Sequence, residues 1–168
     1  ADASWLEDQD FWRMSGIFRD VYLYALPDIH VYDHRVRTTF DQDYENAELE
    51  VQAQLINYHQ KPFSASRLEV ELLTDEHEVV TKQSVELDIT DKEKAEVTTK
   101  TTIPNPKKWS AEDPYLYTLV FTLTGDNDEV VEVFATKVGF RQFELIDNMM
   151  HINGKRIIFK GVNRHEFT

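Results

Sequence analysis

Apolar and polar residues alternate along the middle of the chain with a period of two rather than 3.6. Between Ala47 and Leu55 every odd-numbered residue is apolar, and every even-numbered residue is Glu or Gln. Because successive side chains of a β-strand point to opposite faces, this segment predicts a strand with one buried and one solvated face. A second run, from Tyr115 to Thr124, places large apolar residues at alternate positions among threonines, which predicts a core strand.

Five further segments have strand-like composition and are separated by polar turns such as Asp75–His77 and Gly125–Asp128. These segments are Ile29–Phe40, Arg67–Leu73, Val79–Leu87, Ala95–Ile103 and Glu129–Phe140. About seven short strands with no convincing helix among them are typical of an antiparallel sandwich. We therefore predict an all-β fold, an immunoglobulin-like antiparallel β-sandwich of about seven strands.

The two ends of the chain differ from this middle. Residues 5–21 mix aromatic side chains with acidic and basic ones, a composition that indicates a surface docked against another fold. Near the other end, Asn153–Gly154 suits a two-residue hairpin turn within Met149–Gly161, because both residue types tolerate positive φ. We expect the sandwich to occupy residues 28–141 and the flanking pieces to belong to neighbouring folds.

Composition narrows the function classes. The 168 residues suffice for one domain with a sizeable core, and the apolar fraction of 41% argues against a disordered chain. A net charge of −13 disfavours nucleic acids and anionic membranes as partners. The absence of cysteine excludes disulfides, thiolate metal sites and cysteine nucleophiles. No run approaches the roughly 18 apolar residues of a membrane span.

Several strings along the chain are similar to those of a known enzyme family. They are Ser4–Val21, Pro106–Tyr117, Val138–Arg141, Asn153–Lys155 and Lys160–Glu166. In order and spacing they resemble glycoside hydrolase family 2, in the form typical of its β-galactosidases. The resemblance implies that residues 1–27 end a jelly-roll sugar-binding domain and that residues 142–168 begin a catalytic TIM barrel. Lys108 and Phe167 depart from the family, which more often has an apolar residue and a histidine there.

The resemblance also implies a parent enzyme that hydrolyses terminal β-galactosides such as lactose with retention, using sodium and magnesium. A retaining glycosidase needs two carboxyl groups about 5–5.5 Å apart, and the family's two glutamates would lie beyond Thr168. We therefore expect no catalytic residue here, no activity and no bound ion for this chain alone, and a role in positioning the other domains. Its expected partners are the galactoside substrate and those domains, in an oligomeric, cytoplasmic parent.

Two residues are candidates for the substrate site by resemblance. The counterpart of Asp10 binds a sodium ion beside the galactose, and a carboxylate suits such a hard cation. The other sodium ligands would come from the barrel, so the site is expected to be incomplete; the alternative is a salt bridge to Arg13 or Arg19. His165 follows a strand where a barrel carries its site residues, and the alternative is a histidine without a role at a frayed terminus.

Other residues invite simpler interpretations. His30 and His34 have the four-residue spacing of a helical metal site, but on a strand they would lie roughly 13 Å apart and could not share a zinc ion. The Trp109 ring could stack on a sugar, although packing at the edge of the core is the more economical reading.

Two rival functions remain open. One is a free-standing immunoglobulin-like carbohydrate-binding or adhesion module, against which the hairpin after Arg141 argues. The other is a sibling of the same family, a β-glucuronidase or β-mannosidase. The acidic string Glu7–Asp10 favours galactosides over those substrates, on resemblance alone.

Overall fold

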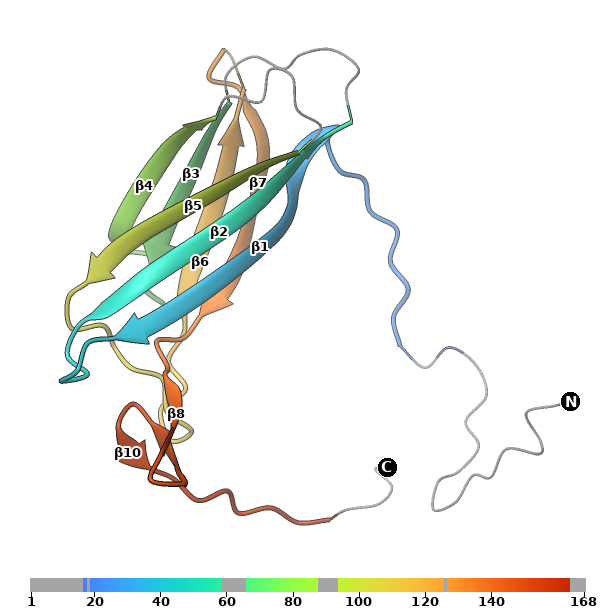
Figure 1. Ribbon diagram of the computed structural model, residues 1–168. Helices are drawn as coiled ribbons and strands as arrows, with labels where there is room; N and C mark the ends of the chain where they lie inside the picture. The colour runs from blue at the N-terminus through green and yellow to red at the C-terminus, as the bar shows by residue number, and fades with distance from the viewer. Residues whose placement is uncertain (1–16, 18, 59–65, 88–93, 126, 164–168) are drawn as a thin grey trace, which may run out of the picture. The chain divides into compact units, whose positions relative to one another are not determined.

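The computed structural model describes residues 17, 19–58, 66–87, 94–125 and 127–163 (Figure 1). The chain divides into two units, one made of Ala1–Ala25 with Ile158–Thr168 and the other of Leu26–Ile157. The described residues of the first unit form no regular secondary structure, whereas the second unit holds ten β-strands. Among all described residues, no helix has the length and apolar character needed to span a membrane.

Seven strands of the second unit form two antiparallel sheets that face each other (Figure 1). One sheet has the order β1-β2-β5, with β1 at Ile29–Phe40, β2 at Ala47–Asn57 and β5 at Lys94–Ile103. The other has the order β4-β3-β6-β7, with β3 at Ser66–Leu73, β4 at Val79–Leu87, β6 at Tyr117–Thr124 and β7 at Val130–Val138. The predicted all-β, immunoglobulin-like sandwich of about seven strands is confirmed.

The core lies between the two sheets and is built from alternate residues of their central strands. On β2 the odd-numbered residues from Ala47 to Leu55 are buried, as the alternation predicts. On β6, Leu119 and Phe121 have no exposed surface, and the Phe121 ring stacks on Phe134 of β7 with 4.6 Å between centroids. Burying each such side chain contributes about 1.5–3 kcal/mol, so this layer holds the sheets together.

A β-bulge in β1 changes which of its side chains face the core. Strict alternation from Ile29 and Val31 would turn Asp33, Arg35 and Arg37 toward the core. In the structure Val31 pairs with Leu55 and Asp33 with Gln54, so Tyr32 is an extra residue in the ladder.

Beyond the bulge the other set of β1 side chains faces inward. Val36 packs against the core cluster and Phe40 is buried, whereas Arg35 and Asp33 are exposed. One inserted residue therefore keeps three charged side chains out of the core, where an unpaired charge would be strongly destabilising.

A small three-stranded meander follows the sandwich within the same unit (Figure 1). Its strands are β8 (Phe143–Ile146), β9 (Met149–Ile152) and β10 (Lys155–Arg156), in the order β10-β9-β8. Both turns have two residues of positive φ, Asp147–Asn148 and Asn153–Gly154, as type I′ hairpin turns require. The hairpin predicted at Asn153–Gly154 is confirmed, but its second strand already ends at Arg156, and the strand β8 was not predicted.

The compact unit of the structure thus runs from Leu26 to Ile157 and includes the meander. The division of the sequence into domains at residues 27/28 and 141/142 stays a prediction.

Candidate functional site

The two residues predicted to reach the substrate, Asp10 and His165, lie outside the described residues. The same holds for Arg13, the alternative partner of Asp10. Their roles therefore stay predictions. The candidate residues that the structure describes lie in the sandwich and the meander.

His30 and His34 point to opposite faces of their sheet because the bulge lies between them. The His30 ring lies 5.9 Å from the Tyr58 ring, and its Nδ1 is 2.7 Å from the carbonyl oxygen of Pro27. The His34 ring instead lies 5.2 Å from the Phe121 ring of the core. The two imidazoles do not converge, and no group of three or more potential metal ligands occurs in the described part of the chain.

Trp109 lies where the meander joins the sandwich. Its backbone N–H donates to the carbonyl oxygen of Phe140 at 2.9 Å, and the Arg141 guanidinium carbon lies 5.1 Å from its ring centroid. Gly139 permits this close approach, since a Cβ there would lie 3.2 Å from the Cβ of Trp109. Trp109 is half-buried and packs at this junction, which agrees with the expected packing at the edge of the core. Stacking of its ring on a sugar stays untested.

Asn153 connects the meander to the sandwich through both ends of its side-chain amide. Its Oδ1 accepts from the backbone N–H of Gln142 at 2.9 Å, and its Nδ2 donates to the carbonyl oxygen of Trp109 at 3.0 Å. The Gln142 side chain in turn accepts from the backbone N–H of Phe40 at 2.7 Å. The turn residue that the sequence singled out for its φ value is therefore also the clamp of this junction.

A second clamp joins β8 to the loop between β1 and β2. The Tyr44 hydroxyl donates to the Glu144 carboxylate at 2.5 Å, and its ring lies against Gly154, where a Cβ would come within 2.6 Å of ring carbon Cε2. The Tyr44 bond, followed by one from Gln142, lowers the pKa of Glu144 below its ordinary value of 4.5. The carboxylate in turn raises the pKa of Tyr44 above 10.0. Together the two clamps fix the orientation of the meander on the sandwich.

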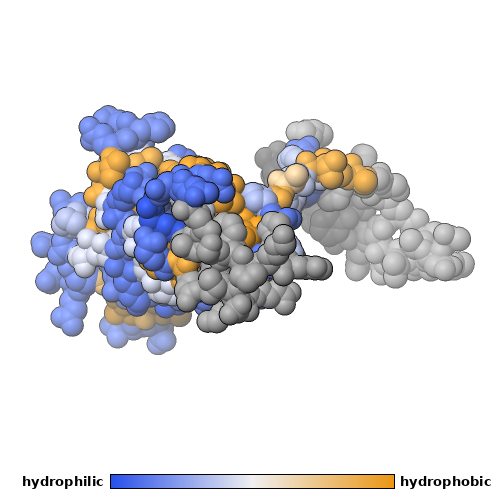
Figure 2. Space-filling view, turned by 90° about the horizontal axis from the view of Figure 1, so that it is seen from above, coloured by the Kyte–Doolittle hydropathy of each residue, from blue (hydrophilic) through white to orange (hydrophobic). Residues whose placement is uncertain are grey.

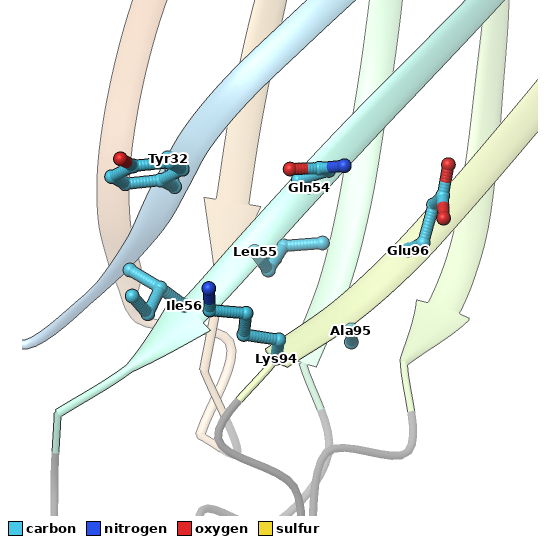
Figure 3. A pocket seen from close by; sticks show the side chains of 7 residues that line it. All are labelled: Tyr32, Gln54, Leu55, Ile56, Lys94, Ala95 and Glu96. Carbon is cyan, nitrogen blue, oxygen red and sulfur yellow. The ribbon is translucent and has the colours of Figure 1, made fainter.

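A pocket of about 340 Å³ opens on the outer face of the β1-β2-β5 sheet (Figure 3). It is lined by Tyr32, Gln54, Leu55, Ile56, Lys94, Ala95 and Glu96, which come from all three strands of that sheet. The register pairs Gln54 with Glu96 and Ile56 with Lys94, so these four side chains share the outer face.

Sequence reasoning missed this pocket. The available signal was Ile56, an apolar residue at an even-numbered position of a strand whose other even-numbered residues are Glu or Gln. Its side chain is buried although it faces away from the core. An apolar floor among polar side chains is the usual composition of a small-molecule site.

Comparison with known proteins places the chain in a family. The sequence model described as Glycosyl hydrolases family 2 matches residues 29–141, and the one for the sugar binding domain of the same family matches residues 1–27. The chain is 48% identical to a β-galactosidase of Priestia megaterium over 99% of its own length, and 49% identical to one of Halalkalibacterium halodurans over 98%. It spans only 16% of the length of each of these relatives.

Solved structures agree with the fold. A glycosyl hydrolase family 2 member from Bacteroides cellulosilyticus superposes with a TM-score of 0.74 at 27% identity, over 81% of this chain and 19% of that one. A β-glucuronidase of Parabacteroides merdae has a TM-score of 0.68 over 83% of this chain and 17% of that one, but its identity of 22% shows the shared fold alone. The resemblance noted in the sequence is thereby confirmed, and the chain belongs to glycoside hydrolase family 2.

Proposed function

We propose that this chain is the positioning domain of a retaining β-galactosidase that hydrolyses terminal β-D-galactosides such as lactose. The observation that supports the substrate class is identity of 48–49% along almost the whole chain to proteins named β-galactosidase. The β-glucuronidase neighbours are 22–23% identical to it and argue only for a common fold. A β-mannosidase or a β-glucuronidase is therefore the less supported alternative. Membership of the family also argues against a free-standing carbohydrate-binding or adhesion module.

The chemistry of such an enzyme comes from two carboxylic acids, one acting as nucleophile and one as acid and base. By resemblance these are glutamates beyond Thr168, in the barrel that residues 142–168 are expected to begin, so this chain alone is proposed to be inactive. Its contribution is to hold a sugar-binding domain, which ends near Pro27, at a fixed position relative to the barrel. The clamps of Asn153 and Tyr44 support this role, because they leave the meander little freedom on the sandwich.

Asp10 and His165, which precede and follow the sandwich in the sequence, are proposed to contact the substrate, Asp10 through the sugar hydroxyls and a sodium ion. Carboxylate oxygens suit sodium and magnesium, the ions proposed for the full-length enzyme. The described residues contain no group of three or more side chains that could together hold either ion. An oligomeric enzyme in the cytoplasm remains part of the same proposal.

Substrate class is tested with the full-length enzyme and nitrophenyl glycosides of galactose, glucuronic acid and mannose. We expect kcat/KM for the β-galactoside to exceed the other two by at least about 100-fold. A site whose polar groups hydrogen-bond the hydroxyl groups of one sugar leaves some of those groups unpaired when another sugar binds. A preference for the glucuronide or the mannoside would refute the proposed substrate. The 168-residue chain, assayed in parallel, is expected to release no nitrophenol, and release by the purified chain would refute its non-catalytic role.

A further inference from the structure

The pocket on the outer face of the β1-β2-β5 sheet has the floor of a binding site. Ile56 is only 5% exposed and forms an apolar base, while Gln54, Lys94 and Glu96 rise around it from β2 and β5 (Figure 3). A volume of about 340 Å³ lies at the lower end of the range for small-molecule sites, about 300–1,000 Å³. The space therefore suits one small ring compound.

An aromatic ring stands at the edge of this floor. The β-bulge gives Tyr32 no partner of its own on β2 and turns it to the outer face, where 61% of its surface is exposed. The Lys94 ammonium lies over this ring, 6.0 Å from its centroid, at the outer limit of a cation–π contact. The exposed part of the Tyr32 ring is the surface on which the C–H groups of a ligand would stack.

The polar groups around the floor are balanced in charge. Within the described part of the chain, neither the Gln54 amide nor the Glu96 carboxylate makes a hydrogen bond or an ion pair. Lys94 and Glu96 carry opposite charges, so the pocket favours neither an anion nor a cation. Amide, ammonium, phenol and carboxylate together supply both donors and acceptors, which is what a molecule with several hydroxyl groups requires.

We propose that this pocket binds a neutral pyranose sugar, stacked on Tyr32 and hydrogen-bonded by Gln54, Lys94 and Glu96. An open pocket with an aromatic wall gives weak affinity, of the order of millimolar. The proposal rests on the sandwich alone and stands whether or not the full-length enzyme prefers galactosides.

The test is a titration of the ¹⁵N-labelled 168-residue chain with galactose, followed by amide chemical shifts. We expect saturable shifts centred on residue 32, residues 54–56 and residues 94–96. Shifts that grow without saturation, or that centre elsewhere, would overturn the proposal. Glucuronate serves as the charged analogue, and tighter binding of glucuronate than of galactose would show recognition of charge instead.

Substitutions locate the contact. Tyr32→Ala should weaken galactose binding by about tenfold, whereas Tyr32→Phe, which keeps the ring, should stay within about threefold. Tyr58→Ala is the matched control, because Tyr58 is equally exposed at 60% and lines no part of the pocket. Gln54→Ala, at a regular position of the strand, should also weaken galactose binding and tests the site independently of Tyr32. Unchanged affinity in both Tyr32→Ala and Gln54→Ala would refute the site, and so would an equal loss in Tyr58→Ala.

Discussion

The backbone N–H of Val31 on β1 donates a 2.8 Å hydrogen bond to the Glu132 carboxylate on β7, so a side chain of one sheet satisfies the edge of the other. β1 is an edge strand with β2 as its only strand neighbour among the described residues, and its outward amides need partners from elsewhere. The bond also lies beside the bulge at Tyr32, where the register of β1 changes. It joins the two sheets at the point where β1 shifts phase.

Removing this acceptor should destabilise the sandwich. Glu132→Ala leaves a part-buried N–H without a partner and is expected to lower the free energy of unfolding by about 1–3 kcal/mol. Glu132→Gln keeps an oxygen acceptor and should lower it by no more than about 0.5 kcal/mol. Urea unfolding of both variants measures the difference, and equal losses would show that the hydrogen bond is not what Glu132 contributes.

Deleting Tyr32 should prevent folding, although replacing it should not. The deletion restores strict alternation and turns Asp33, Arg35 and Arg37 toward the core, at a cost of about 4–5 kcal/mol or more. Tyr32→Ala keeps the extra residue and should change stability by no more than about 1 kcal/mol, since the side chain is exposed. Circular dichroism melts compare the two variants. A cooperative melt of the deletion variant near that of the original chain would contradict the role of the bulge.

Asn153→Ala should loosen the meander from the sandwich. The substitution removes two side-chain hydrogen bonds and places alanine at a φ of 50°, for an expected loss of about 2–3 kcal/mol. Asn148→Gly is the matched control, because Asn148 has a φ of 61° in an exposed turn, where glycine adopts that value freely. Hydrogen exchange at the amides of β8–β10 should accelerate in the first variant, and equal acceleration in the control would contradict the clamp.

The Tyr44–Glu144 bond should make the stability of the junction depend on pH at both ends of the scale. The pKa of Glu144 is lowered in the folded chain. The stability that Glu144 contributes is therefore present above its unfolded pKa and is lost as pH falls through its folded pKa. The pKa of Tyr44 is raised, so its contribution is present below 10.0 and is lost as pH rises through the folded value.

The urea midpoint, measured across this pH range, tests both limbs. Glu144→Gln should flatten both limbs, because the Glu144 carboxylate is also what raises the pKa of Tyr44. Tyr44→Phe should remove the basic limb and reduce the acid limb, since Gln142 still lowers the pKa of Glu144. A profile identical to the original in Tyr44→Phe would show that the pair does not couple to folding.

Local pattern was sufficient to predict the sandwich. The alternation in Ala47–Leu55 and in Tyr115–Thr124 reflects which face of each strand is buried, and the polar turns divide the remaining strands. Asn153–Gly154 is likewise a local signal, because positive φ is a property of the two residues themselves.

Features that depend on distant partners were not predictable. The bulge in β1 arises where Ile29 and Val31 must face the same core as Val36 and Phe40, and only the pairing with β2 reveals the register shift. The clamp of Asn153 on Trp109 joins residues 44 positions apart, and the pocket needs three strands side by side. Asp10 and His165 rest on family resemblance, since no periodic pattern carries their chemistry.

The positioning role is tested most directly by inserting two glycines between Arg141 and Gln142 of the full-length enzyme. This insertion separates the sandwich from its clamped meander, and we expect kcat/KM for a β-galactoside to fall by about 100-fold or more while the protein still folds. The same insertion between Glu76 and His77, in an exposed turn, should leave kcat/KM unchanged. Full activity after the first insertion, with both variants folded, would contradict the account of this domain as a spacer.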